Sequence, residues 1–293
     1  MNERVERVVV VGGTHGNERT GVVLARRWQR DPAEITRPSF DTTVLVGNPE
    51  AIEHNVRYLD QDLNRCFAAS ALEALATDRE SARAKVVAEQ ILAVDPNRQA
   101  LFDLHTTVCP MGTTVILMDP SPFNLGLVAS LQRADSRVQC FYWHAPGREP
   151  VHLNGLCPRG IAVEVGAVAH GTVRADVLEA TRTVLAGALD YVEAWNRGQR
   201  NAGEEAVLHR FVRNVDFPRD ADGEFAALVH PERQDQNFVP LSVDAPLFVD
   251  LDGRTIGYDG EPGLCPIFIN EAAYYEVGVA MSLTERITMR VPA

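Results

Sequence analysis

Three residues have the types and positions to bind one metal ion. His15 and Glu18 stand one helical turn apart in GGTHGNE (residues 12–18), and His105 follows the apolar run at 100–104. If both segments end strands of one sheet, the three side chains meet at the same sheet edge. Two histidines and a glutamate are a recurrent catalytic zinc set, which leaves a fourth position for water. A phosphate-binding loop is the alternative, but the GxGxxG and Gly-Lys-Ser/Thr spacings are absent.

Two further carboxylates could act beside that metal. Glu164 interrupts the apolar pattern IAVEVG at 161–166. A buried glutamate is costly unless it has a partner, and a role as general base toward metal-activated water would explain it. Asp103 stands two residues before His105 and shares its strand face, so it either orients that histidine or caps or pairs elsewhere.

The segment 47–65 is strongly polar although it follows an apolar strand pattern. Its second half, NVRYLDQDLNR (residues 55–65), contains two arginines, two asparagines and two aspartates. Such a mixture of charges is usually a solvated surface loop. Beside a metal site, arginines can instead hold a substrate carboxylate or polarise a carbonyl oxygen. The residues alone leave both interpretations open.

Short β-branched runs alternate with longer amphipathic segments up to about residue 198. This alternation predicts an α/β domain with a mainly parallel or mixed central sheet. The valine run at 8–11 predicts a central strand that is covered on both faces. The predicted strands are 5–11, 43–46, 100–104, 113–118, 137–142 and 161–165, and the predicted helices are 18–30, 79–94, 122–134 and 175–195.

A polar, glycine-bearing stretch at 197–203 divides the chain into two predicted domains. Residues 1–198 form the expected zinc-binding catalytic α/β domain. Residues 204–293 form a smaller domain that is expected to be β-rich. Its short apolar runs at 224–229, 246–251, 267–269 and 286–291 are separated by Asp-Gly turns at 222–223, 252–253 and 259–260.

Composition excludes several classes of protein. The 293 residues carry 28 basic and 40 acidic side chains, a formal net charge of −12, which argues against nucleic-acid binding. Neither a membrane span nor a signal peptide is expected, because long apolar stretches are absent. The five cysteines are scattered and never spaced as CxxC, which argues against disulfides and a cysteine zinc site. The expected location is cytoplasmic.

Taken together, these motifs resemble a known family. The resemblance rests on GGTHGNE (12–18), NP (48–49), RYLDQDLNR (57–65), DLHTT (103–107), VEVG (163–166), DFPRD (216–220), HP (230–231), LDG (251–253) and NEAAYYE (270–276). The sequence is similar to the aspartoacylase/succinylglutamate desuccinylase branch of the zinc carboxypeptidase-like fold. It most resembles the aspartoacylases and the related aminoacylase 3, over roughly residues 8–285.

The resemblance implies specific roles at the metal site. His15, Glu18 and His105 would bind one zinc ion per chain. Arg57 would polarise the scissile carbonyl, and Glu164 would activate water and later protonate the leaving nitrogen. The metal set and Glu164 agree with what the residues themselves predict, whereas the role of Arg57 comes from the resemblance alone.

The resemblance also implies a small-molecule substrate. Asn64 and Arg65 would hold the α-carboxylate of an N-acyl amino acid, and Tyr274 would reach in from the second domain. The implied reaction is amide hydrolysis, with N-acetyl-L-aspartate giving acetate and L-aspartate. Assembly into a homo-oligomer is implied as well, while nucleic-acid and membrane partners are not.

Two departures from the aspartoacylase pattern affect the expected specificity. Asn154 stands where aspartoacylases carry an arginine that grips the substrate's side-chain carboxylate, and Arg159 is nearby but out of register. Val277 and Gly278 replace a lysine pair. These changes leave the zinc chemistry intact. They make deacylation of other N-acyl amino acids, as by aminoacylase 3 or succinylglutamate desuccinylase, the alternative to aspartoacylase activity.

Two more distant alternatives are less favoured. A peptide carboxypeptidase is disfavoured because the segment 270–276 would cap the pocket against long substrates. A protein that only binds zinc or carboxylates is disfavoured because it needs neither Glu164 nor Arg57.

Overall fold

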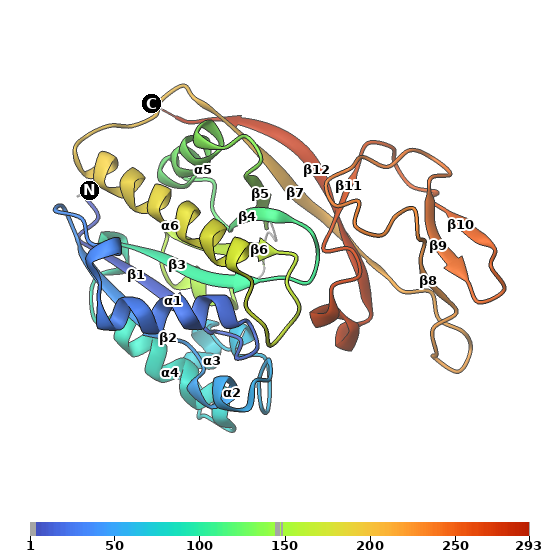
Figure 1. Cartoon of the computed structure of the whole chain (residues 1–293), viewed down its shortest axis with the longest axis horizontal. Helices are drawn as coiled ribbons and strands as arrows, with labels where there is room; N and C mark the ends of the chain where they lie inside the picture. Colours follow the sequence, from blue (N-terminus) through green and yellow to red (C-terminus); the bar gives the residue numbers. More distant parts are fainter. Residues whose placement is uncertain (1–3, 144–146, 148, 293) are drawn as a thin grey trace.

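A mixed β-sheet forms the centre of the computed structural model, which describes residues 4–143, 147 and 149–292 (Figure 1). Within these residues the sheet has nine strands in the order β11-β12-β7-β5-β4-β6-β3-β1-β2. A second sheet has the order β10-β9-β8. The predicted fold class, a mainly parallel or mixed α/β sheet followed by a β-rich part, is confirmed.

The strands and helices have the following bounds. The strands are β1 (Arg7–Gly12), β2 (Asp41–Val46), β3 (Gln99–Thr106), β4 (Gly112–Leu117), β5 (Gln139–Tyr142), β6 (Gly160–Gly166), β7 (Glu205–Asp216), β8 (Ala227–Val229), β9 (Pro246–Asp250), β10 (Thr255–Gly257), β11 (Cys265–Ile267) and β12 (Val279–Arg290). The α-helices are α1 (Arg19–Arg30), α2 (Pro49–His54), α3 (Ala69–Glu73), α4 (Arg79–Leu92), α5 (Pro122–Ala134) and α6 (Ala175–Asn196). Short 3₁₀ helices are η1 (Ala33–Ile35), η2 (Leu63–Arg65), η3 (Pro96–Arg98), η4 (Leu153–Leu156) and η5 (Ala272–Val277).

Strand β1 explains the valine run. It lies between β2 and β3 in parallel register. Side chains alternate between the two faces of a strand, so Val8 and Val10 join the core formed with α1 and α6. Val9 and Val11 pack on the other face, in the core that contains α4. The strand is covered on both faces, as the sequence predicts, but it is the second strand from the edge of the sheet and not a central one.

The same alternation directs functional side chains of β3 and β6 to one face. On β6, Val163 and Val165 belong to the core formed with α6, so Glu164 between them points to the opposite face. In the parallel register of β3 and β6, His105 is paired with Glu164. The loop after β1 begins at the same sheet edge, because β1 and β3 are also parallel neighbours.

The sheet continues beyond the predicted linker. β7 pairs in parallel with β5 at Phe141–His209 and Tyr142–Arg210, and β12 pairs antiparallel with β7 along nearly its full length. Sequence patterns missed β7 and the first half of β12. The outer part of β7 is exposed and carries arginine and asparagine, so it lacks the alternating apolar pattern of a half-buried strand.

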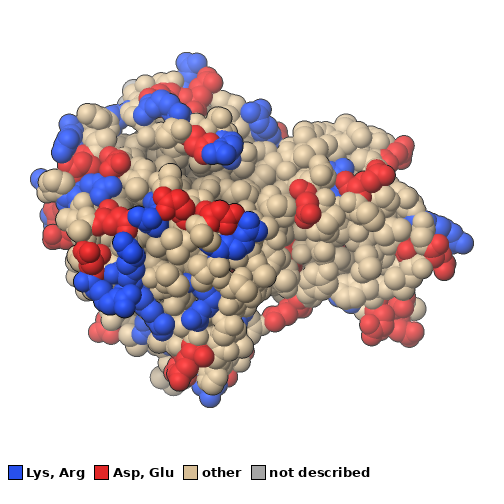
Figure 2. Space-filling model, in the orientation of Figure 1, with Lys and Arg blue, Asp and Glu red and all other residues tan. Residues whose placement is uncertain are grey.

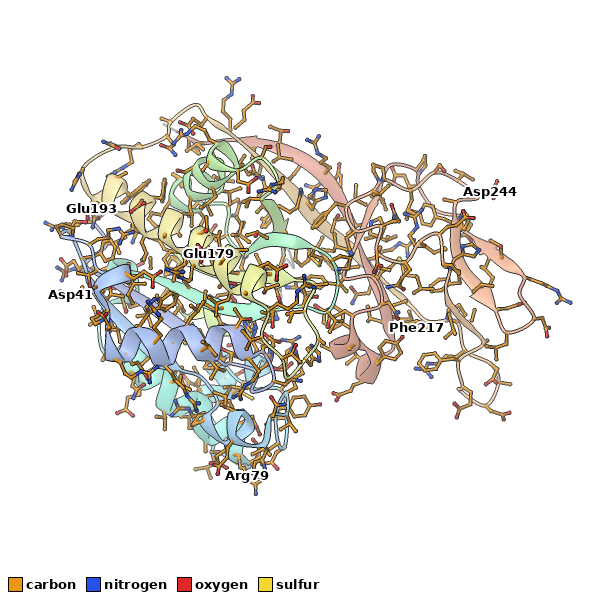
Figure 3. All side chains as sticks on the ribbon, viewed as in Figure 1. Asp41, Arg79, Glu179, Glu193, Phe217 and Asp244 are labelled. Carbon is orange, nitrogen blue, oxygen red and sulfur yellow. The ribbon has the colours of Figure 1, made fainter. Side chains whose placement is uncertain are left out.

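The β-rich part has its own core. Phe217, Leu247, Phe248, Tyr258 and Leu283 belong to it, and Figure 3 shows Phe217 where β7 leads into the small sheet. Positive and negative side chains are interspersed over the face seen in Figure 2. Among the described residues, no helix combines the length and the apolar character needed to cross a membrane.

Gly12 provides a test of the packing between β1 and α1. A Cβ at this position would lie 2.1 Å from the carbonyl oxygen of Gly21 in α1. We expect Gly12→Ala to lower the free energy of unfolding by about 1–3 kcal/mol, the usual cost of overpacking, measured by urea unfolding. Gly187→Ala in α6 is the control, because the nearest atom there is the flexible end of Leu131. Equal stability of Gly12→Ala and the unmodified protein would contradict this packing.

Candidate metal and active site

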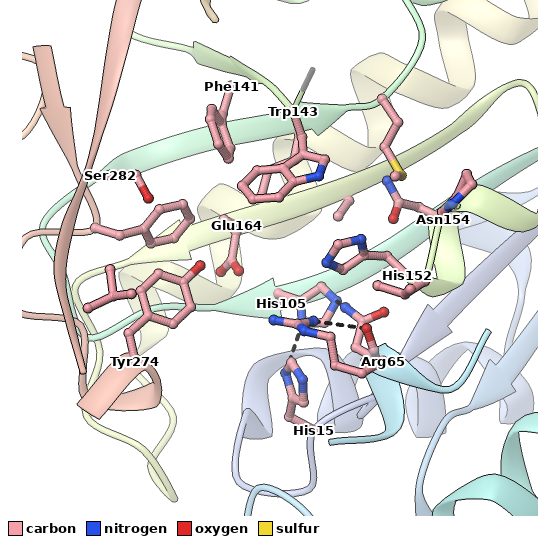
Figure 4. Close-up of a pocket in the computed structure, with 18 of the residues that line it drawn as sticks. His15, Arg65, His105, Phe141, Trp143, His152, Asn154, Glu164, Tyr274 and Ser282 are labelled. Carbon is pink, nitrogen blue, oxygen red and sulfur yellow. Dashed lines mark hydrogen bonds between the residues drawn. The ribbon is translucent and has the colours of Figure 1, made fainter. Parts of the chain in front are cut away.

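His15, Glu18 and His105 converge at the carboxyl end of the sheet. His15 lies in the loop after β1, Glu18 directly precedes α1, and His105 is on β3. Glu18 Oε1 lies 2.5 Å from His15 Nδ1, and Glu18 Oε2 lies 2.9 Å from His105 Nδ1. The two Nδ1 atoms are 3.2 Å apart (Figure 4). All three side chains are buried, so the structure brings the predicted ligand set together.

The outer nitrogen of each histidine contacts a carboxylate. His15 Nε2 is 2.9 Å from Asp62 Oδ1, and His105 Nε2 is 2.7 Å from Asp103 Oδ2. A metal ion at the common centre would take the lone pair of each Nδ1, and Asp62 and Asp103 would then accept the proton of each Nε2. Asp103 also accepts a hydrogen bond of 2.6 Å from Thr14 Oγ1. Of the two roles left open for Asp103, contact with His105 is the one observed.

This donor set fits a zinc ion. Two imidazole nitrogens on a tetrahedral zinc ion stand about 3.3 Å apart, close to the 3.2 Å found between His15 and His105. The third donor is an anion: although burial opposes its charge, the two histidines hold the pKa of Glu18 well below its usual range. With the proton of each imidazole on Nε2, two nitrogen lone pairs and a carboxylate would face one point, and these are the donors a divalent cation requires.

Arg57 lies against this set. Its guanidinium donates to Glu18 Oε1 at 3.0 Å and to Asp62 Oδ2 at 3.1 Å. Glu18 Oε2 accepts a further hydrogen bond of 3.1 Å from the backbone N–H of Thr106. Arg57 thus connects Glu18 with Asp62, the carboxylate that contacts His15, and it also borders the central cavity.

Glu164 faces the same cavity from β6. Its Oε2 is enclosed and has no hydrogen-bond partner within the described part of the chain. Burial and the nearby carboxylate of Glu18 raise the pKa of Glu164 to about 8, despite the opposing effect of His105. A carboxyl group whose pKa lies near neutral pH can both take up and release a proton, which is the property of a general acid–base group.

The three residues expected to bind substrate border the cavity as well. The buried Asn64 accepts a hydrogen bond of 2.8 Å from Leu153 N, and the half-exposed Arg65 donates to the Asn64 carbonyl at 2.9 Å. Tyr274, on η5, packs against Phe268 with ring centroids 5.4 Å apart. Figure 4 shows the Tyr274 hydroxyl and the Glu164 carboxylate directed into the same space.

The cavity has a volume of about 610 Å³ and a largely apolar wall. Sequence reasoning missed this wall, which consists of Ile116, Met118, Phe141, Trp143, Val151, Ala162, Phe268, Val277 and Val279. The run FYW at 141–143 was a signal that could have indicated part of it. His152 was also missed; burial and the charge of Arg65 lower its pKa to about 3, so its ring is neutral. Among the described lining residues, the guanidinium groups are those of Arg57 and Arg65.

Asn154 and Arg159 lie in different places. Asn154 borders the cavity, is 4% exposed, and its Nδ2 has no hydrogen-bond partner among the residues that the structure describes. Arg159 is not among the described lining residues. Its guanidinium donates to the carbonyl of Asn97 and lies 5.3 Å from the ring centroid of Phe123. Arg159 therefore does not supply the charge that Asn154 lacks.

Two family models match the chain. The model of the succinylglutamate desuccinylase/aspartoacylase catalytic domain matches residues 4–192. The model of the AstE/AspA barrel-sandwich hybrid domain matches residues 204–286. Together they account for the mixed α/β part and the β-rich part of the fold.

Individual relatives agree with these models. A probable aspartoacylase of Trichodesmium erythraeum is 38% identical over 99% of this chain and 100% of its own length. The human N-acyl-aromatic-L-amino acid amidohydrolase (carboxylate-forming) is 40% identical over 99% of this chain and 94% of its own. The crystal structure of murine aminoacylase 3 has a TM-score of 0.94 at 38% identity, and the match covers 100% of this chain and 99% of that one. The chain therefore belongs to the succinylglutamate desuccinylase/aspartoacylase family.

Proposed function

We propose that this protein hydrolyses the amide bond of N-acyl amino acids and uses one zinc ion held by His15, Glu18 and His105. The observation that carries the proposal is the convergence of this donor set with Glu164 and Arg57 around one cavity. The relatives named as aspartoacylase and as N-acyl-aromatic amino acid amidohydrolase support the same reaction class. All of these enzymes release a free amino acid from an acyl group.

The side chains divide the chemistry between them. Zinc would supply Lewis acidity toward water and the acyl carbonyl. Glu164 accepts the proton of the attacking water and passes it to the leaving nitrogen, which departs as an amine. Arg57 donates to the carbonyl oxygen as negative charge develops there. Asp62 and Asp103, which contact Nε2 of the two histidines, would hold them in the tautomer that presents the Nδ1 lone pair to zinc.

Three residues would position the substrate. The Arg65 guanidinium binds the α-carboxylate as a charge-assisted pair, and Asn64 supports it from the neighbouring position. Tyr274 is uncharged, because burial raises its pKa, so its hydroxyl can donate to the bound substrate. η5 contributes Tyr274 and Val277 to the wall of the cavity. A compact N-acyl amino acid therefore fits the cavity better than a long peptide.

The wall of the cavity favours an uncharged side chain on the substrate. Aromatic and aliphatic groups line part of it, and the neutral Asn154 contributes an amide where an arginine would grip a second carboxylate. N-acyl amino acids with aromatic or apolar side chains are therefore the first candidate substrates. N-acetyl-L-aspartate, expected from the sequence, is the second candidate, and the relative named probable aspartoacylase supports it.

Removal of a ligand should remove the metal. We expect His105→Ala to lose most of its zinc, because two remaining donors hold the ion weakly, and metal analysis of the purified protein measures this. His54→Ala, an exposed histidine, should retain one zinc per chain. Full zinc content in His105→Ala would refute the assignment.

Loss of the proton acceptor should stop turnover without loss of metal. Glu164→Gln keeps the shape but cannot accept the proton, so we expect kcat to fall about 10²–10⁴-fold while zinc content stays near one. Glu149→Gln, a change at another cavity-lining glutamate, should leave kcat nearly unchanged. A fall of less than threefold in Glu164→Gln would assign the base to another residue.

Specificity can be tested at Asn154. We expect higher kcat/KM for N-acetyl-L-tyrosine than for N-acetyl-L-aspartate. The substitution Asn154→Arg should shift the ratio toward aspartate by roughly tenfold or more, because charged pairs are about twice as strong as neutral hydrogen bonds. An initial preference for aspartate above about 10³-fold, roughly 4 kcal/mol in transition-state stabilisation, would show that another group supplies the charge.

A further inference from the structure

Glu80 is a buried carboxylate that lies outside the active-site cavity and accepts hydrogen bonds from four donors. It lies in the first turn of α4, just after Arg79, which is labelled in Figure 3, and its side chain has no solvent exposure. Oε1 accepts from Asn48 Nδ2 at 3.0 Å and from Leu59 N at 2.8 Å. Oε2 accepts from Asp60 N at 3.0 Å and from Gln61 N at 3.3 Å.

The negative charge of Glu80 suits its role as the acceptor of these four hydrogen bonds. Burial opposes ionisation, but the hydrogen bonds from Leu59, Asn48, Asp60 and Gln61 hold its pKa below the usual range. An ionised carboxylate is an acceptor on both oxygens, so it can satisfy three consecutive backbone N–H groups and an amide. A glutamine at this position would place its amide NH₂ group, a donor, against N–H donors that one carboxylate oxygen of Glu80 now binds.

The three N–H groups that Glu80 binds belong to the segment between Arg57 and Asp62. Asp62 Oδ1 lies 2.9 Å from His15 Nε2, and Asp62 Oδ2 accepts from Arg57 at 3.1 Å. The carbonyl of Arg57 also accepts a hydrogen bond of 3.1 Å from Gly16 N, beside His15. A shift of residues 59–61 would therefore move the groups that orient His15 and Arg57.

The acidic cluster around Glu80 is satisfied by protein donors. Asp60 accepts from Arg79 N at 3.0 Å and from the Arg79 guanidinium at 3.1 Å. Asp78 caps α4 through Ser81 N at 2.8 Å. Although Asp60, Asp78 and Glu80 lie close enough to share an ion, these hydrogen bonds already account for their oxygens. The cluster therefore stabilises the loop at residues 59–61 and does not form a second metal site.

We propose that Glu80 is a positioning residue of the active site, which fixes the backbone of residues 59–61 and thereby sets Asp62 against His15 and Arg57. This inference rests on the proposed zinc-dependent deacylation. Among the described residues, α4 contributes no group to the cavity wall. Through Glu80, this helix nevertheless affects the chemistry of the site.

The test compares Glu80→Ala and Glu80→Gln with Ser81→Ala. Ser81→Ala removes the Ser81 hydroxyl from the cap of the same helix without touching residues 59–61, so it controls for helix stability. In the Glu80 variants we expect faster hydrogen exchange at residues 59–61. Zinc affinity, measured by competition with a chelator, and kcat/KM for N-acetyl-L-tyrosine should each fall about 10–100-fold. In Ser81→Ala only the unfolding midpoint should fall.

The outcomes separate the two proposals. Unchanged zinc affinity and kcat/KM in both Glu80 variants would overturn the positioning role, as would equal losses in Ser81→Ala. If Glu80→Ala does not fold, Glu80→Gln carries the same comparison, because it keeps the volume and one acceptor. If the unmodified protein hydrolyses no N-acyl amino acid, the proposed function fails, while exchange and zinc affinity still decide the role of Glu80.

Discussion

The pairing of His15 and of His105 with a carboxylate is the interaction on which the rest of the site depends. Asp62 and Asp103 come from different segments, yet each lies within hydrogen-bond distance of Nε2 of one imidazole. Without both contacts, rotation or a change of tautomer would replace a lone pair at the centre with an N–H group. The sheet, the loop after β2 and the start of α1 are arranged so that these two contacts form together.

The sheet meets this requirement through simple alternation. Residues at every second position of β3 and β6 supply the core beneath α6, and His105 and Glu164 lie at positions between them. Apolar packing on one face therefore fixes the direction of His105 and Glu164 on the other. A one-residue slip of β6 would bury Glu164 in the core and turn a valine toward the face that carries His105.

The sequence predicted the parts of the site that depend on local patterns. His15, Glu18 and His105 were recognisable because strand ends and helical spacing are short-range features, and Glu164 because it interrupts an apolar strand. The contact between Asp62 and His15 was not predictable, because it depends on a loop held by Glu80 from a distant helix. β7 was missed because arginine and asparagine hide its pattern, and its neighbours β5 and β12 are far away in the chain.

The pairing of β5 with β7 has a consequence for synthesis of the chain. On the ribosome, β5 emerges long before its neighbour, so its edge has unpaired N–H and C=O groups until residues 205–216 appear. The wall of the cavity is completed still later, because Val279 and Ser282 belong to the last strand. A nascent chain that stops short of β12 thus already contains His15, Glu18 and His105, but the edge of β7 that β12 covers is still unpaired and open to aggregation.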